Sequence, residues 1–147
     1  MGAAVEIKLQ EVEKLARWLN AFALSGGDKE KLLSDLGGVA VEQTHERFDA
    51  QRDPQGDPWR GLTEKYKKRK GLKSSGGILV YGGLMRMSIE SQLKDSDTIV
   101  VGSPMEYAKY HQEAKNPKSK RIFLGFGTDD ISELQNEVDE FMRRHVA

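Results

Sequence analysis

The sequence predicts an α+β fold in which about three main helices pack on a small, mostly antiparallel β-sheet, with long mobile loops. Three observations support this prediction. Short stretches of alternating apolar and polar residues stand apart from longer stretches with helical spacing, turn-forming residues separate them, and the chain has no internal repeat or long linker. With 147 residues, 37% hydrophobic and 31% charged, the chain fits a single domain over residues 1–147 with a thin core.

The first elements are a strand and a helix. Val5, Ile7 and Leu9 alternate with polar residues, which predicts a half-buried strand. The period then changes to that of an amphipathic helix over Gln10–Leu24, which Ser25–Gly27 ends.

A second helix and a tight turn follow. Asp28 is a good N-cap for this helix, and Gly37–Gly38 is its weak point, where we expect a kink or a close helix contact. Its apolar stripe consists of Leu32, Leu33, Leu36, Ala40 and Phe48. Two prolines and a glycine in Asp53–Pro58 make the chain turn, so we expect Trp59 to be a buried anchor that packs near Phe48.

The middle of the chain reads as a basic helix, a loop and strands. Glu64–Lys70 predicts a short helix, and Gly71–Gly77 has no apolar pattern and predicts a mobile loop. Strands are expected at Ile78–Val80, around Met87–Ile89 and at Thr98–Val101, with the last two forming an antiparallel hairpin.

Helices follow in the last third. Ser103–Glu106 has the residues of a capping box, with proline at the first helical position, and the helix should end before the polar loop Lys115–Lys120. Ile122–Leu124 predicts a strand or an extended segment, and Thr128–Asp130 caps the final helix. The apolar face of that helix is expected to consist of Ile131, Leu134, Val138, Phe141 and Met142.

Composition excludes several classes of function. The absence of cysteine excludes a disulfide framework, a thiol nucleophile and a Cys-ligated metal site. No apolar run approaches the roughly 20 residues that span a bilayer, and Met1–Leu9 contains Glu6 and Lys8 in place of a signal core. We therefore expect a soluble protein that is not exported and has no membrane partner.

The net charge of zero conceals segregated blocks. Residues 28–57 have eight acids and four bases, a net −4, whereas residues 58–89 have eight bases and one acid, a net +7. The net charge is −3 over residues 90–113, +4 over residues 114–128 and −4 over residues 129–147. Opposite blocks can pair within one fold or between identical copies that meet head to tail.

Residues that could support catalysis have simpler explanations. His45 reads as a surface histidine, and His145 lies in a terminal turn. His111 reads as a packed or hydrogen-bonded histidine at the sheet edge, because zinc needs three or four ligands and no second ligand stands at a suitable spacing. Asp129 and Asp130 fall in the first turn of a helix, where acids cap amides. The prediction is a protein without catalytic residues, metal or cofactor.

A basic run with an embedded Tyr66 is the one feature that suggests nucleic acid. The run consists of Lys65, Lys67, Lys68, Arg69, Lys70 and Lys73. The alternative is a solvated helix face that pairs with acidic blocks, and the balanced net charge favours this alternative.

Several phrases in this order resemble the phage virion morphogenesis family, the tail completion proteins of Mu-like and related tailed phages. The phrases are Phe48–Asp49, Asp53–Leu62, Ile78–Val80, Gly83–Leu84, Ser88–Ile89, Val101–Ser103, Tyr107–Gln112 and Arg121–Gly125. The resemblance extends over nearly the whole chain. It implies a non-enzymatic structural protein that acts in the virion where the tail joins the head, as a ring of several copies, after assembly in the host cytoplasm.

Three alternatives stay open at this point. The protein could be a tail terminator or a head-closure protein, a nucleic-acid-binding accessory protein that uses Lys65–Lys73, or, least favoured, a hydrolase that relies on His111. Expected partners are further copies of the chain, neighbouring neck, connector and tail proteins, and the phage genome through non-specific contact.

Two sets of residues are the candidates for these roles. The candidates for contact with another subunit or with DNA are Lys65, Lys67, Lys68, Arg69, Lys70, Lys73, Lys118, Lys120 and Arg121. The candidate structural anchors are Trp59, Phe48, Tyr107, His111 and Phe123.

Overall fold

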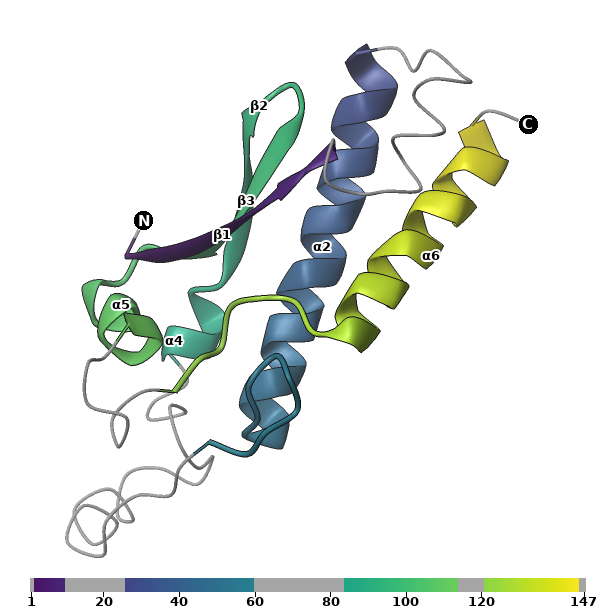
Figure 1. The fold of residues 1–147 in the computed structure, drawn as a ribbon. Helices are drawn as coiled ribbons and strands as arrows, with labels where there is room; N and C mark the ends of the chain where they lie inside the picture. Colours follow the sequence, from purple (N-terminus) through teal and green to yellow (C-terminus); the bar gives the residue numbers. More distant parts are fainter. Residues whose placement is uncertain (1, 10–25, 60–83, 114–120, 146–147) are drawn as a thin grey trace, which may run out of the picture.

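The fold is α+β, as the sequence predicts, in a computed structural model that describes residues 2–9, 26–59, 84–113 and 121–145 (Figure 1). Its strands are β1 (Ala3–Lys8), β2 (Glu90–Asp95) and β3 (Thr98–Ser103). Its helices are α2 (Gly26–Ala50), α4 (Leu84–Met87), α5 (Glu106–Glu113) and α6 (Thr128–His145). Helix α2 contacts the sheet and also packs beside α6.

The three described strands form an antiparallel sheet in the order β1-β3-β2. The predicted strand at the N-terminus is confirmed. An antiparallel hairpin is also present, but its first strand is Glu90–Asp95 instead of the segment around Met87–Ile89. Val5 pairs with Val101 and Ile7 with Ile99, so these alternate side chains share the face that packs against α2. The opposite face includes Glu6 of β1, Val100 of β3 and Gln92 of β2.

Helix α2 confirms the predicted second helix and buries its apolar stripe. Leu32, Leu33, Leu36 and Phe48 are fully buried. The helix stays continuous through Gly37–Gly38, and the close contact at Gly37 is with the sheet instead of with another helix. A Cβ on Gly37 would collide with Cδ1 of Ile99 and would lie 2.9 Å from Cβ of Ser91. Glycine therefore lets α2 approach the sheet closely.

One predicted strand is displaced in the described part of the chain. Met87 ends the short helix α4, and β2 begins only at Glu90, because Ser88 closes the last turn with its amide bonded to Leu84 O and its hydroxyl to Met85 O. Residues 122–124, for which the sequence left a strand or an extended segment open, form no strand, since side chains from helices α2 and α5 bond to their backbone groups.

Helix α6 begins where the sequence predicts and packs its apolar face on the core. Leu134, Val138, Phe141 and Met142 are buried. Ile131 is 46% exposed, so its place on that buried face is wrong. It lies in the first turn of the helix, one turn before the first buried residue.

Several predictions concern residues outside those described. They are the helix over Gln10–Leu24, the helix over Glu64–Lys70, the loops Gly71–Gly77 and Lys115–Lys120, and the strand at Ile78–Val80. No helix among the described residues is long and apolar enough to cross a membrane.

Candidate functional site

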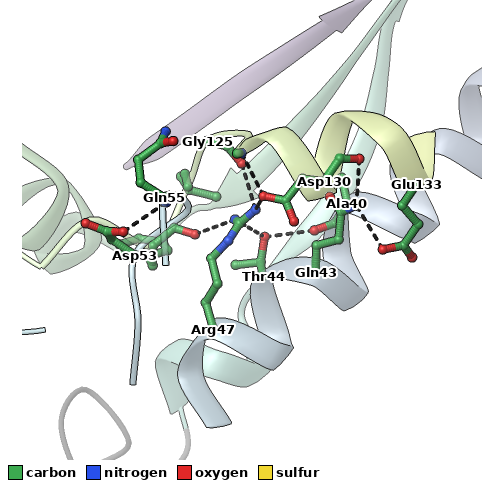
Figure 2. A network of polar contacts seen from close by, with 12 residues as sticks. Ala40, Gln43, Thr44, Arg47, Asp53, Gln55, Gly125, Asp130 and Glu133 are labelled. Atoms are coloured by element: carbon green, nitrogen blue, oxygen red, sulfur yellow. Dashed lines mark hydrogen bonds and ion pairs between the residues drawn. The ribbon is translucent and has the colours of Figure 1, made fainter. Parts of the chain in front are cut away.

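A buried arginine joins three parts of the chain (Figure 2). Arg47 lies on the inner face of α2, and its side chain is only 8% exposed. Its guanidinium donates to Phe123 O and Gly125 O, each at 2.8 Å, and to Asp130 Oδ2 at 2.6 Å. Planar, rigidly spaced N–H groups suit this convergent set of acceptors. Arg47 therefore fixes the segment before α6 and the first turn of α6 against α2.

Asp130 also caps helix α6, as the sequence predicts for this acidic pair. Gly127 O accepts the first bond of the helix from Ile131 N, and Asp130 Oδ2 accepts from Gly127 N at 2.8 Å. This return bond from the third helical residue is one half of a capping box. Gln43 of α2 donates to Asp130 O at 3.1 Å and to Glu133 Oε2 at 3.3 Å, which adds a second polar link between α2 and α6 (Figure 2).

The turn that follows α2 completes this junction. Asp53 Oδ1 accepts from the backbone amides of Gln55 and Asp57, each at 2.9 Å, and Gly56 has a φ of +90°. Such side-chain-to-backbone bonds and a positive φ are typical of tight turns. A Cβ on Gly127 would collide with Pro54 O, so the turn packs directly on the start of α6.

A pocket of about 290 Å³ opens between the turn and the two helices. Its ionisable lining consists of four carboxylates and two guanidinium groups, and its net formal charge is therefore negative. These residues are Glu46, Asp53, Asp129, Asp130, Arg47 and Arg52. No group of three or more His, Cys, Asp or Glu residues among those described is arranged to hold a metal ion.

Three of the candidate anchors form an aromatic cluster. Phe48 and Phe123 are fully buried, and Trp59 is 7% exposed. The Phe48 ring meets Trp59 edge-on with centroids 5.5 Å apart and lies 5.4 Å from Phe123. Trp59 Nε1 donates to Ile122 O at 2.8 Å, which satisfies its polar atom. The cluster attaches the end of the turn to α2 and to the segment before α6.

The other two candidate anchors differ from this cluster. Tyr107 is 46% exposed on α5, and its hydroxyl donates to Met105 Sδ, two residues away, at 2.7 Å. His111 is half-buried, and its ring meets Tyr110 edge-on at 5.4 Å. Its carbonyl accepts from Arg121 N at 2.8 Å. These two contacts join His111 to its neighbour on α5 and to the start of the segment before α6.

The candidates for contact with another subunit or with DNA are mostly outside the described residues. This applies to Lys65, Lys67, Lys68, Arg69, Lys70, Lys73, Lys118 and Lys120. Arg121 is described, and only 8% of it is exposed in the single chain. The chain returns to the core there, because the next residues, Phe123 and Leu124, are buried.

Sequence reasoning missed two polar side chains that hold the core. Gln112 of α5 accepts from the amides of Phe123 and Leu124 and donates to Leu124 O, in place of a neighbouring strand. Arg47 interrupts the buried stripe of α2. Its spacing of three from Thr44 and seven from Ala40 puts it on the inward face, and this spacing could have identified it.

The outer face of the sheet has one well-defined ion pair. Lys94 Nζ of β2 lies 2.7 Å from Glu6 Oε1 of β1. The hydrogen bond from Lys94 lowers the pKa of Glu6, and the same bond raises the pKa of Lys94. Both groups are exposed to solvent, so the pair links the two edge strands loosely across β3.

The amino-acid sequence matches a known protein family over most of its length. A family model matches residues 10–146, which include α2, the turn, the sheet hairpin and α6, and its description is that of proteins that build the phage virion. The class that this match defines is that of proteins that take part in phage virion morphogenesis. The chain belongs to the phage virion morphogenesis family.

The match to one relative agrees with this membership. The chain is 30% identical over 110 residues to Mu-like prophage FluMu G protein 1 of Haemophilus influenzae, and the match covers 74% of this chain and 75% of that protein. No solved structure matches the chain.

Proposed function

We propose that this virion protein completes the phage tail and joins it to the head at the neck, as a ring of identical subunits. The observation that supports the proposal is the position of the two most acidic blocks. Residues 28–57 and 129–147 each have a net charge of −4, and they contribute α2 and α6, which pack side by side (Figure 1). Two acidic blocks that are far apart in the sequence therefore lie on neighbouring helices.

Exposed carboxylates from both helices surround the Arg47 junction. Glu42 and Glu46 on α2 and Asp129 and Glu133 on α6 are all exposed. An acidic surface attracts a basic one, and residues 58–89 of a neighbouring copy have a net charge of +7. Repeated contact of two different surfaces is heterologous, and it closes into a ring when the rotation between copies fits.

We expect three kinds of partner for such a ring. Each copy contacts two further copies in the ring, and the two rims of the ring contact neck or connector proteins and tail proteins. The finished protein stays in the virion neck after assembly in the host cytoplasm. The basic segment is then available for non-specific contact with the phage genome if it faces the channel.

Particles made without the protein test the role at the neck. We expect electron micrographs to show filled heads and complete-looking tails that remain separate, and joining should return when the protein is supplied from a plasmid. Joined, infectious particles in the absence of the protein would contradict the proposal.

Salt tests the contact between copies. Surface charges are screened over about 10 Å at 0.1 M salt and about 3 Å at 1 M. Light scattering should therefore show larger assemblies of the purified protein at low salt than at 1 M salt. An unchanged mass in both solutions would exclude charge pairing as the force between subunits.

A further inference from the structure

Strand β2 forms an open edge of the sheet. Among the described residues β2 pairs with β3 alone, and all six of its residues are exposed. Unpaired amides and carbonyls on such an edge bind a further strand readily. We propose that two copies of the protein pair through β2 in antiparallel fashion, about a two-fold axis at Gln92. This contact is independent of the head-to-tail contact proposed for the ring.

The charges of β2 select this register. With Gln92 opposite Gln92 of the second copy, Glu90 lies opposite Lys94 and Lys94 lies opposite Glu90. Directly opposite residues point to the same face of a sheet, and opposite charges there stabilise the pair. A shift that puts Gln92 opposite Leu93 would put Glu90 opposite Asp95, which are both acidic. The sequence Glu90–Lys94 is therefore complementary to itself.

The side chains of β2 fit the same register. Residues 90, 92 and 94 alternate along the outer face, where Lys94 already meets Glu6. An ammonium has three donors, so Lys94 can bind a second carboxylate without releasing the first. Leu93, which is 39% exposed, meets Ser91 of the second copy on the inner face, and the contact covers its apolar surface.

A β-bulge limits the length of the contact. The register of β2 against β3 is regular from Glu90 to Leu93 and shifts between Leu93 and Asp95. Bulges bend the strand and restrict pairing at a sheet edge. The pairing segment therefore has four residues in regular register, Glu90–Leu93, and ends with Lys94 at the shift. Such a small contact gives a weak, reversible dimer.

Cysteine cross-linking tests the pairing directly, because the natural chain has no cysteine. Directly opposite residues of an antiparallel pair have Cα atoms about 4.5–5.5 Å apart, a separation that a disulfide can span. Gln92→Cys should form a covalent dimer within minutes in oxidised glutathione. The matched control is Lys8→Cys, which is also exposed but lies on the other edge strand, β1. It should cross-link only at the rate of random collisions.

Charge exchange tests the register. Glu90→Lys in the Gln92→Cys background puts two lysine pairs in opposition and should slow cross-linking by about tenfold, since each like pair is destabilising. Glu90→Lys combined with Lys94→Glu restores opposite charges and should restore the rate. Glu6→Gln removes only the partner within the same subunit and should leave the rate unchanged. Circular dichroism of each variant confirms that it is folded.

Two results would overturn the inference. One is cross-linking of Gln92→Cys no faster than that of Lys8→Cys. The other is a slow rate in both the single and the double charge variant, which would place the contact in another register or on another surface. Neither result bears on the ring, whose failure would appear in the particles and in the salt dependence.

Discussion

At the scale of single residues, Arg47 is the buried side chain that links α2 to the segment before α6 and to α6 itself by hydrogen bonds. A buried guanidinium loses its hydration, and the loss is offset only if its donors find acceptors of good geometry. Arg47 has two carbonyls and one carboxylate within 2.8 Å. The same carboxylate caps α6, so one side chain orders both the helix and the segment before it.

Replacement of Arg47 by Met should lower the free energy of unfolding by about 3–5 kcal/mol, because Asp130 and two carbonyls then stay buried without their donor. Urea denaturation measures the loss. The matched control is Arg86→Met. Arg86 also pairs with an aspartate, Asp49 at 3.1 Å, but at the surface, so its removal should cost less than about 1 kcal/mol. Equal losses in the two variants would contradict the role given to Arg47.

Trp59 gives a second prediction at this scale. Trp59→Ala should cost about 3–5 kcal/mol, since it removes a nearly buried ring from contact with Phe48. Trp59→Phe keeps an aromatic ring but leaves Ile122 O without its donor, and it should cost about 1–3 kcal/mol. Both changes are measured by urea denaturation. A loss below about 1 kcal/mol for Trp59→Ala would place this ring in a contact with another subunit.

At the scale of elements, the two adjacent glycines of α2 allow a paired experiment. Gly38→Ala meets nothing within 4 Å and should stabilise the protein by up to about 1 kcal/mol through helix propensity. Gly37→Ala gains the same propensity but forces a methyl group into Ile99 and Ser91. The overpacking costs about 1–3 kcal/mol, so the two variants should differ by that amount in unfolding free energy. Similar stabilities would show that α2 does not need its close approach to the sheet.

Elements with a strong local pattern were predictable, and elements held by distant side chains were not. The alternation of β1, the stripe of α2 and the cap of α6 follow from residues close in sequence. The segment Ile122–Leu124 looks like a strand, but Gln112 and Arg47 take the place of a neighbouring strand, and no local pattern reveals this.

In the candidate site, the buried aromatic residues could be predicted from the sequence, but the exposure of Tyr107 and the burial of Arg121 could not. The aromatic residues Phe48, Trp59 and Phe123 stand out in the sequence as large apolar side chains beside turns. Tyr107 has the same residue character but is exposed, because the face that a short helix buries depends on what packs against it. Arg121 looks basic and accessible in sequence, yet the chain enters the core at that point.

At the scale of the whole molecule, charge segregation is the property that points to assembly. The basic segment Lys65–Lys73 can meet the acidic surface of α2 and α6 in a neighbour, or it can face the genome in the channel of a ring. We favour the first arrangement, because the net charge is balanced and each basic block has an acidic counterpart.

The triple variant Lys67→Gln, Lys68→Gln and Lys70→Gln separates these arrangements. If the segment pairs with a neighbour, the variant should form fewer rings and join heads to tails less often, as measured by light scattering and by counting joined particles. If the segment faces DNA, rings should form normally while packaged DNA is retained less well. Normal ring formation together with normal joining would show that the preferred contact is wrong.

The most direct measurement of the central claim is a cryo-electron microscopy reconstruction of the neck in intact particles. We predict a closed ring of copies of this chain between head and tail, with α2 and α6 of each copy against the basic segment Lys65–Lys73 of the next. Particles that lack the chain at the neck, or that contain it as isolated copies without contact to one another, would contradict the proposed ring.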